Sequence, residues 1–173
     1  VSMQDMNPPT IIISLAQACF DAGGRLWIVG GSVRDQLLRL TPKDWDVEIH
    51  HLTGNKLQGI LNQFGKNKKV GKSFGVWKLD YRGMEIDVSL PTRDDTIDPD
   101  MGIEEALARR DLTINAIAYD PLTKEYMDPF DGSTDIHQKI LRLTTQNALR
   151  SDPLRAFRAA QFAARFQFTI EPE

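Results

Sequence analysis

The fold is decided by the sequence LWIVGGSVRD at residues 26–35, followed by KDWDVEI at residues 43–49. The first stretch opens with four apolar residues that are typical of a buried strand, and its two glycines end that strand. Ser32 can then cap a short helix that runs to about Leu40. In the second stretch acidic and apolar residues alternate, which predicts a strand with one acidic face. A strand, a helix and another strand in this order indicate an α/β fold.

Outward from this stretch, apolar residues at helical spacing and short alternating runs predict further helices and strands. Helices are expected at residues 11–22, 53–64 (capped by Thr53), 103–110 and 152–166, and strands at 75–80, 84–90 and 140–143. The polar stretch 91–102 is expected to be a loop. Residues 1–145 are therefore expected to form one domain, a small mixed sheet flanked by helices. Residues 146–173 are expected to begin a helical domain that is cut off at Glu173.

Composition limits the possible functions. The 173 residues contain 21 Lys and Arg against 24 Asp and Glu, a net charge of −3, which excludes a uniformly basic nucleic-acid coat. Any nucleic-acid binding must come from a local patch. Cys19 is the single cysteine in the sequence, which excludes a disulfide framework and a Cys-rich zinc site. No apolar run reaches the ~20 residues of a membrane span, and residues 1–10 lack a targeting pattern. A soluble, cytoplasmic protein is expected.

The turn at Gly30 and Gly31 has the features of a phosphate-binding loop. Two glycines let a ligand approach the backbone closely, and the start of a helix favours an anion. Arg34, in the first turn of that helix, can add a bidentate phosphate contact. A plain strand-to-helix turn with a surface arginine explains the same residues equally well.

Asp44 and Asp46 form a second chemical feature. Two positions apart on a strand, their carboxylates project from one face and repel each other unless a cation lies between them. Mg²⁺ is the usual cation where oxygen ligands meet phosphates, and Asp87 on a later strand can supply a third carboxylate if that strand lies alongside. Three carboxylates can hold two metal ions for nucleotidyl transfer. The alternative, a solvated acidic face, fits Glu48 better.

These motifs resemble the signature of the class II tRNA nucleotidyltransferases (CCA-adding enzymes) and their bacterial poly(A) polymerase relatives. Both belong to the DNA polymerase beta-like nucleotidyltransferase superfamily. The resemblance continues in order through GKSFG (71–75), DVSLP (87–91), RRDLTINA (109–116), DPFDG (128–132) and DPLRAFR (152–158). It implies a nucleotidyltransferase head domain followed by the first helix of an all-α neck.

The resemblance also implies a role for individual residues. Asp44 and Asp46 match the two metal-binding aspartates, and Asp87 is the expected third catalytic carboxylate. The expected nucleotide-contacting residues are Gly30, Gly31, Arg34, Arg110 and Arg158. Many family members have an arginine where this chain has Gln161, and glutamine cannot neutralise a phosphate.

Helical geometry supports part of this assignment independently. On the last helix Arg155, Arg158 and Arg165 fall on one side. The residues placed to pack are Leu154, Phe157, Ala160 and Ala164. A cationic helix face beside an acidic metal site is what a nucleoside triphosphate requires.

The implied activity is template-independent transfer of CMP and AMP from CTP and ATP to the 3′ end of tRNA, with release of pyrophosphate. Two Mg²⁺ ions are expected to take part in catalysis. No amino-acid general base is needed. Two alternatives remain open: a poly(A) polymerase with a different RNA primer, and a nucleotide- or RNA-binding module without turnover. In the family the bases are selected by residues of the neck beyond Glu173, so the sequence leaves the added bases open, as it does the oligomeric state.

Other polar and aromatic residues are interpreted structurally. The cluster Lys66, Lys68, Lys69 and Lys72 is more typical of a solvated surface turn than of an RNA contact. The three tryptophans and Cys19 are expected in the core. Thr113 and Asn115 are expected to hold the loop after Arg110, and none of the three histidines has the spacing of a catalyst or metal ligand.

Overall fold

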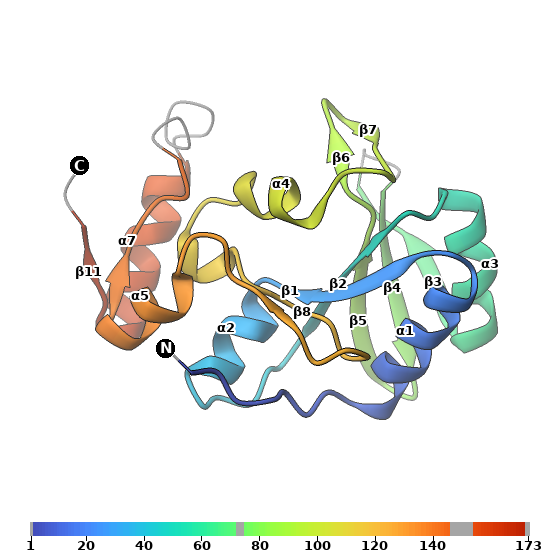
Figure 1. Ribbon diagram of the computed structural model, residues 1–173, viewed down its shortest axis with the longest axis horizontal. Coiled ribbons are helices and arrows are strands. Elements are labelled where there is room, and N and C mark those ends of the chain that lie inside the picture. The colour runs from blue at the N-terminus through green and yellow to red at the C-terminus, as the bar shows by residue number, and fades with distance from the viewer. Residues whose placement is uncertain (1, 72–74, 146–153, 172–173) are drawn as a thin grey trace.

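The computed structural model describes residues 2–71, 75–145 and 154–171, and these form a seven-stranded mixed sheet with helices around it (Figure 1). The strand order is β3-β4-β5-β2-β1-β8-β9. Only β2 and β5 are parallel among these neighbours; the others are antiparallel. The strands are β1 Arg25–Val29, β2 Trp45–His50, β3 Lys66–Lys69, β4 Val76–Tyr81, β5 Met84–Ser89, β8 Ala118–Tyr119 and β9 Tyr126–Met127.

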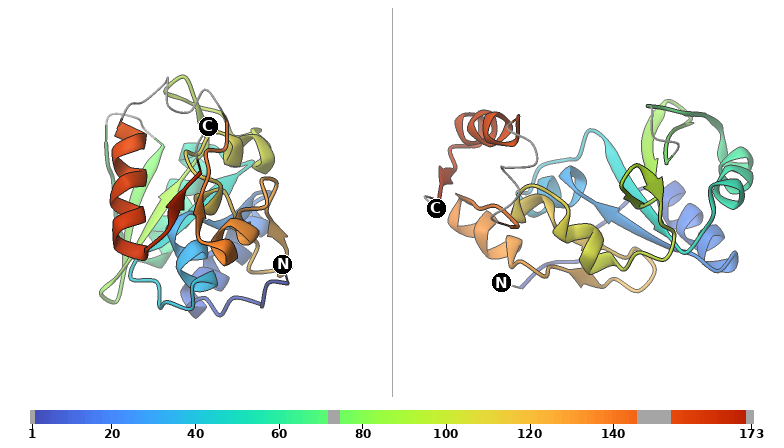
Figure 2. Two further views of the ribbon diagram at one scale, coloured as in Figure 1. Left: turned by 90° about the vertical axis from the view of Figure 1, so that its left-hand side faces the viewer. Right: turned by 90° about the horizontal axis from the view of Figure 1, so that it is seen from above.

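Helices and two short strand pairs complete the described chain. The helices are α1 Thr10–Asp21, α2 Gly31–Leu37, α3 Gly54–Phe64, α4 Ile103–Ala108, α5 Gly132–Gln138 and α7 Leu154–Phe166, with a 3₁₀ turn at Thr113–Asn115. The pairs are β6 Thr92–Arg93 with β7 Thr96–Ile97, and β10 Ile140–Leu141 with β11 Thr169–Ile170. The molecule is elongated, with α5 and α7 at one end and α3 and β3 at the other (Figures 1 and 2). None of the described helices combines the length and apolar character needed to cross a membrane.

The alternation of strand side chains divides the core between the two faces of the sheet. Leu26 and Ile28 of β1 join the larger cluster, which is completed by α1, α3 and apolar residues of β2, β4 and β5. Trp27 and Val29 point to the other face and pack on Leu107 of α4 in a smaller cluster. Because β2 pairs Glu48 with Trp27, the acidic side chains of β2 lie on the α4 face. The three tryptophans and Cys19 are buried, as expected.

The expected mixed sheet with flanking helices is confirmed, and Thr53 caps α3 by accepting a hydrogen bond from the Lys56 N–H. The expected capping role of Ser32 is wrong. Ser32 lies inside α2, where its hydroxyl donates to the Val29 carbonyl (2.9 Å) and accepts from the Asp46 N–H (3.2 Å). The serine therefore ties the start of α2 to both neighbouring strands.

Several elements differ from the sequence expectations. Lys66–Lys69 forms an edge strand rather than a turn, and lysines suit an edge because they discourage pairing with another chain. The expected loop 91–102 contains the β6–β7 hairpin. The DPFDG motif has a structural role: the Asp128 carboxylate accepts from the N–H groups of Gly132 and Ser133 at the start of α5.

The packing face expected for α7 is wrong. Leu154 is 64% exposed, and Ala160 and Ala164 are exposed as well. The helix instead packs through Ala159, Phe162, Ala163 and Phe166. The side chains of Arg155 and Phe157 lie outside the described residues, as do Lys72, Asp152 and the boundary after residue 145. The division into a head and the beginning of a neck therefore stays a prediction.

Candidate active site

The helix α2, the segment 40–44, the start of β2 and the end of α7 surround a hollow of about 430 Å³. Its lining residues are Gly31, Ser32, Arg34, Asp35, Leu40, Thr41, Lys43, Asp44, Asp46, Arg165 and Phe166. The tight turn at Gly30 brings β1 directly into α2, and the chain returns at Thr41 to enter β2 alongside. Arg165 and Phe166 come from the far end of α7. The hollow thus joins the glycine turn and the acidic strand predicted from the sequence.

The two expected metal-binding aspartates both line this hollow, in different surroundings. Asp44 is exposed and lies just before β2, which begins at Trp45 rather than at residue 44. Asp46 lies on the strand and is half-buried. The backbone N–H of Asp46 is held by Ser32, so α2 fixes the strand where its carboxylate emerges.

Asp87 lies beside Asp46 because β5 runs parallel to β2 in the register that pairs these two residues. Both carboxylates therefore emerge on the same face of the sheet. Asp87 also has a cationic partner: Lys78 Nζ contacts Asp87 Oδ1 at 3.1 Å and Glu85 Oε1 at 2.7 Å. The expected third carboxylate is thus adjacent to the site, and Lys78 partly neutralises it.

The ionised form of the Asp46 carboxylate is disfavoured by its surroundings. Burial and the neighbouring Asp87 raise the pKa of Asp46 above its usual value, and Asp44 raises it further. Arg110 and Arg34 lower the pKa of Asp46 without cancelling the rise. The site therefore carries negative charge that a bound cation would relieve.

Arg110 reaches the same place on the face of the sheet that α4 covers. It directly follows α4 and the C-cap residue Arg109, and α4 packs over the face on which Asp46 emerges. A Cβ placed on Gly30 would lie 3.0 Å from Arg110 Nη1 and 3.6 Å from Asp46 Oδ2. Gly30 has φ +63°, in the region that favours glycine. The glycine thus leaves open a space that the Arg110 guanidinium and the Asp46 carboxylate both border.

Arg34 is held from several sides. Its Nε and Nη2 contact Asp35 Oδ1 at 3.0 and 2.9 Å, and its Nη1 donates to Asn115 Oδ1 at 2.8 Å. The ring of Phe162 lies 4.9 Å from the guanidinium carbon and adds a cation–π contact. Of the two residues expected to hold the loop, Asn115 thus bonds to Arg34, and Thr113 donates to the buried Asp135 (2.6 Å).

Arg158 lies apart from the hollow. Its Nε is 3.6 Å from Asp111 Oδ2, and Asp111 in turn accepts a 3.4 Å hydrogen bond from Asn115. Arg158 is thus linked through Asp111 and Asn115 to Arg34 but does not line the hollow. Gln161 is exposed on the same helix.

The interpretation of Glu48 as a solvated residue is wrong. Its side chain is only 11% exposed, with Oε1 2.7 Å from His50 Nε2 and Oε2 3.5 Å from Arg110 Nη2. Burial raises the pKa of Glu48, but the hydrogen bond from His50 and the charge of Arg110 outweigh it, so the pKa lies below its usual value. The signal for this role was its spacing of two residues from Asp46, which places both on one face.

The site suits a divalent cation that takes some of its ligands from the protein and the others from a substrate. Carboxylate oxygens are the donors that Mg²⁺ prefers, and repulsion around Asp46 favours a cation. Within residues 2–71, 75–145 and 154–171, no three acidic, histidine or cysteine side chains form a closed metal cluster. Mg²⁺ commonly binds through one or two carboxylates completed by water and phosphate oxygens. Asp44 and Asp46 are therefore the residues that fit this ion.

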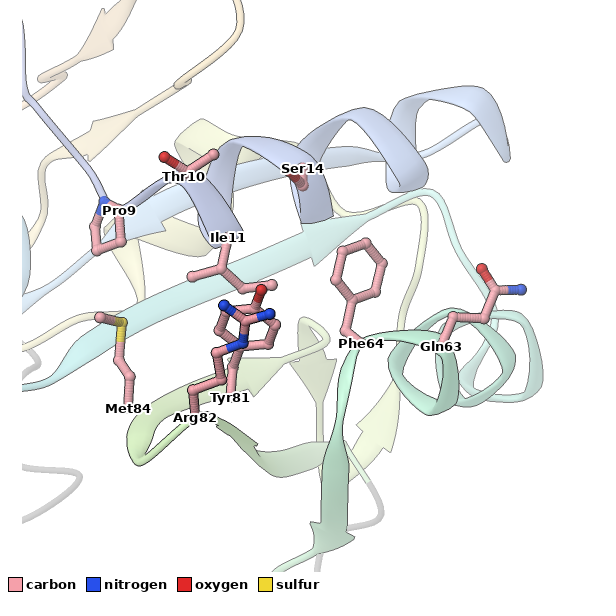
Figure 3. Close-up of a pocket in the computed structure, with 9 residues that line it drawn as sticks. All are labelled: Pro9, Thr10, Ile11, Ser14, Gln63, Phe64, Tyr81, Arg82 and Met84. Carbon is pink, nitrogen blue, oxygen red and sulfur yellow. The ribbon is translucent and has the colours of Figure 1, made fainter.

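A second hollow, of about 550 Å³, lies between α1, α3 and the β4–β5 turn (Figure 3). Its lining is largely apolar, and among the described residues that form it Arg82 alone is charged. These lining residues include no carboxylate that could hold a metal ion. The chemistry therefore belongs to the hollow that contains Asp44 and Asp46.

Comparison with known proteins gives concordant results. The family model for the poly A polymerase head domain matches residues 26–142. The multifunctional CCA protein of Haemophilus ducreyi is 37% identical over 151 residues, covering 82% of this chain and 35% of that protein. That of Psychromonas ingrahamii is 40% identical over 161 residues, covering 86% and 38%. The chain thus spans little more than a third of the length of these relatives.

Solved structures match over nearly the whole chain. The Bacillus stearothermophilus CCA-adding enzyme in complex with CTP superposes with a TM-score of 0.85 at 30% identity, covering 96% of this chain and 42% of that one. The Thermotoga maritima CCA-adding enzyme complexed with tRNA gives a TM-score of 0.81 at 28% identity, covering 98% and 41%.

Proposed function

The chain belongs to the poly A polymerase head domain family, and we propose that it is the catalytic head of a CCA-adding tRNA nucleotidyltransferase. Such an enzyme transfers CMP and AMP from CTP and ATP to the 3′ end of tRNA and releases pyrophosphate. The observation that carries the proposal is the meeting of Asp44, Asp46 and Arg34 in one hollow, with Arg110 adjacent across Gly30. The names of the relatives, and the CTP and tRNA in the solved structures, support the choice of substrates.

The arginines neutralise the triphosphate. Asp35 and Asn115 hold the Arg34 guanidinium in a fixed orientation, and a guanidinium has five N–H donors. Donors that do not face Asp35 or Asn115 can bind phosphate oxygens. Arg110 adds a second cation beside Asp46, and Arg158, linked to Arg34 through Asp111 and Asn115, is the expected third. Fixed donors stabilise the charge that builds up on the phosphates during transfer and need no reorganisation at that moment.

Asp44 and Asp46 are the residues that would hold Mg²⁺, and Asp87 is the additional carboxylate beside them. Mg²⁺ bound there would lower the pKa of the attacking 3′ hydroxyl and stabilise the departing pyrophosphate, and we propose that two ions take part. The protein's own contribution is to orient the carboxylates: Ser32 fixes the Asp46 backbone, and the β2–β5 register fixes the position of Asp87. Action on tRNA would place the protein in the cytoplasm, as expected from the sequence.

Incorporation of labelled CMP and AMP into tRNA that lacks its 3′ CCA, by the full-length protein, tests the proposal. Asp44→Ala with Asp46→Ala should abolish incorporation, whereas Asp94→Asn with Asp95→Asn, an exposed acidic pair whose left-handed backbone asparagine also adopts, should leave it unchanged. Long A tracts on other RNA primers would identify a poly(A) polymerase instead. Nucleotide binding without incorporation would contradict the transferase function.

A further inference from the structure

Glu48 sits between two nitrogen-bearing side chains on the acidic face of β2. One of its oxygens accepts from His50 Nε2 at 2.7 Å, and the other lies 3.5 Å from Arg110 Nη2. His50 is itself fixed, because its Nδ1 contacts the Met101 carbonyl at 2.6 Å. Carbonyl and carboxylate oxygens only accept hydrogen bonds, so Nε2 donates to Glu48 when it carries a proton, and the close Nδ1 contact with Met101 keeps the ring in place. His50 therefore locks the Glu48 carboxylate in one orientation.

The contacts from Met101 through His50 and Glu48 to Arg110 begin and end on the two sides of α4. Met101 lies two residues before α4, and Arg110 lies two residues after it. The His51 N–H donates to the Pro99 carbonyl at 2.7 Å, which joins the end of β2 to the segment leading into α4. Glu48 and the segment that carries Arg110 thus belong to one connected unit.

Arg110 has two carboxylates on β2 within its reach. Glu48 faces its Nη2, while its Nη1 is 3.0 Å from the point where a Cβ of residue 30 would lie, and Asp46 Oδ2 is 3.6 Å from the same point. Both Asp46 and Glu48 interact electrostatically with this arginine. A guanidinium that closed onto Asp46 would occupy an oxygen that the proposed metal requires.

We propose that Glu48, locked by His50, is a positioning residue that holds the Arg110 guanidinium beside Gly30 and keeps it from pairing with Asp46. Because Glu48 keeps Arg110 and Asp46 from pairing with each other, Arg110 stays available to phosphate and Asp46 stays available to the divalent cation. The part concerning the cation rests on the proposed function. The part concerning the position of Arg110 does not, since the contacts are present without substrate.

The first experiment measures the position of Arg110 without any metal, by NMR of its side-chain ¹⁵Nε–¹H group in this chain. Glu48→Gln has almost the same shape as Glu48 but removes the charge, so the Arg110 signal should shift, and exchange of its Nη protons should change by at least threefold. Glu125→Gln removes a surface Glu–Arg pair of Arg25 and should leave the Arg110 signal unchanged. An unchanged Arg110 signal in folded Glu48→Gln would overturn the proposal. If Glu48→Gln fails to fold, His50→Gln, which unlocks Glu48, takes its place with the same expected outcome.

The second experiment measures Mn²⁺ affinity by calorimetry in wild type, Glu48→Gln, Arg110→Gln and the double variant. In the Glu48→Gln variant Arg110 is free to pair with Asp46, so adding Arg110→Gln should raise the Mn²⁺ affinity at least fivefold. In the wild-type background Arg110→Gln should raise the Mn²⁺ affinity less than about twofold. Simple loss of charge predicts the same factor in both backgrounds. Equal factors would overturn the claim that Glu48 protects Asp46. A wild-type chain that binds no Mn²⁺ would contradict the proposed metal site and, with it, the protective role, while the NMR result would still decide the positioning of Arg110.

Discussion

Replacing Gly30 with alanine separates the two functions of this glycine, its backbone conformation and the space it leaves. Gly30 adopts φ +63° and ψ −134°, which an alanine adopts only with strain of about 1–3 kcal/mol. The new Cβ would meet Arg110 Nη1 at 3.0 Å, closer than ordinary van der Waals contact. Because Arg110 Nη1 is the end of a flexible side chain, the guanidinium moves and the backbone strain accounts for most of the lost stability.

The displacement of Arg110 should lower kcat/KM and contribute little to the loss of unfolding free energy. A misplacement approaching 1 Å in a catalytic group costs up to about 10²-fold. We therefore expect Gly30→Ala to lower kcat/KM for CMP incorporation by roughly 10- to 100-fold and to lower the unfolding free energy by about 1–3 kcal/mol.

Two glycines of this chain provide matched controls. Gly83 has φ +83°, and no atom lies within 4 Å of the place that a Cβ would take, so Gly83→Ala adds strain without a contact near the site. Gly59 lies in α3 with open space around it, so Gly59→Ala should be neutral or stabilising by up to about 1 kcal/mol. Urea unfolding and incorporation kinetics check both quantities. Full activity in Gly30→Ala, or an equal loss of activity in Gly83→Ala, would refute the role of Gly30 in placing Arg110.

Three further changes test other parts of the structure. A Cβ on Gly132 would lie 2.1 Å from the Thr113 carbonyl oxygen, so Gly132→Ala should lower the unfolding free energy in urea by about 1–3 kcal/mol. The pKa of Glu48 is lowered by folding, so its ionised form stabilises the protein above its ordinary value of 4.5 and this stabilisation is lost as the pH falls through the lowered pKa. Urea unfolding should therefore show a difference between wild type and Glu48→Gln that is largest at neutral pH and shrinks below about pH 4.5; a pH-independent difference would contradict this sign. Arg110→Ala should reduce kcat/KM for CMP incorporation by roughly 10²–10³-fold, with partial recovery in Arg110→Lys, whereas Lys69→Ala on the exposed edge strand should change it less than about threefold.

The local part of the site was predictable from the sequence because it depends on residues close together in the chain. The glycine pair that ends β1 and the alternation of β2 place Gly31, Arg34 and Asp46 within 16 positions of one another. Their meeting in one hollow follows from a single turn and a single strand register. Short-range patterns of this kind determine the direction in which a side chain points.

The remainder depends on contacts that no local pattern encodes. Spacing places Glu48 on the same face as Asp46, but its burial arises because α4, more than 50 positions later, covers that face of the sheet. The packing face of α7 was mispredicted for a related reason. Periodicity gives the angles between its side chains, but the contact of Phe162 with Arg34 of α2 decides which side faces the rest of the protein.

Asp44 and Asp46 are central to the proposed function, because they would bind a nucleoside triphosphate together with a divalent cation in the hollow between α2 and β2. Calorimetric titration of CTP into the chain with Mn²⁺ or with EDTA tests this most directly. We expect binding that requires Mn²⁺ and is lost in Asp44→Ala with Asp46→Ala, while circular dichroism shows an unchanged fold. Equal CTP affinity with and without Mn²⁺, or in wild type and the double variant, would contradict it.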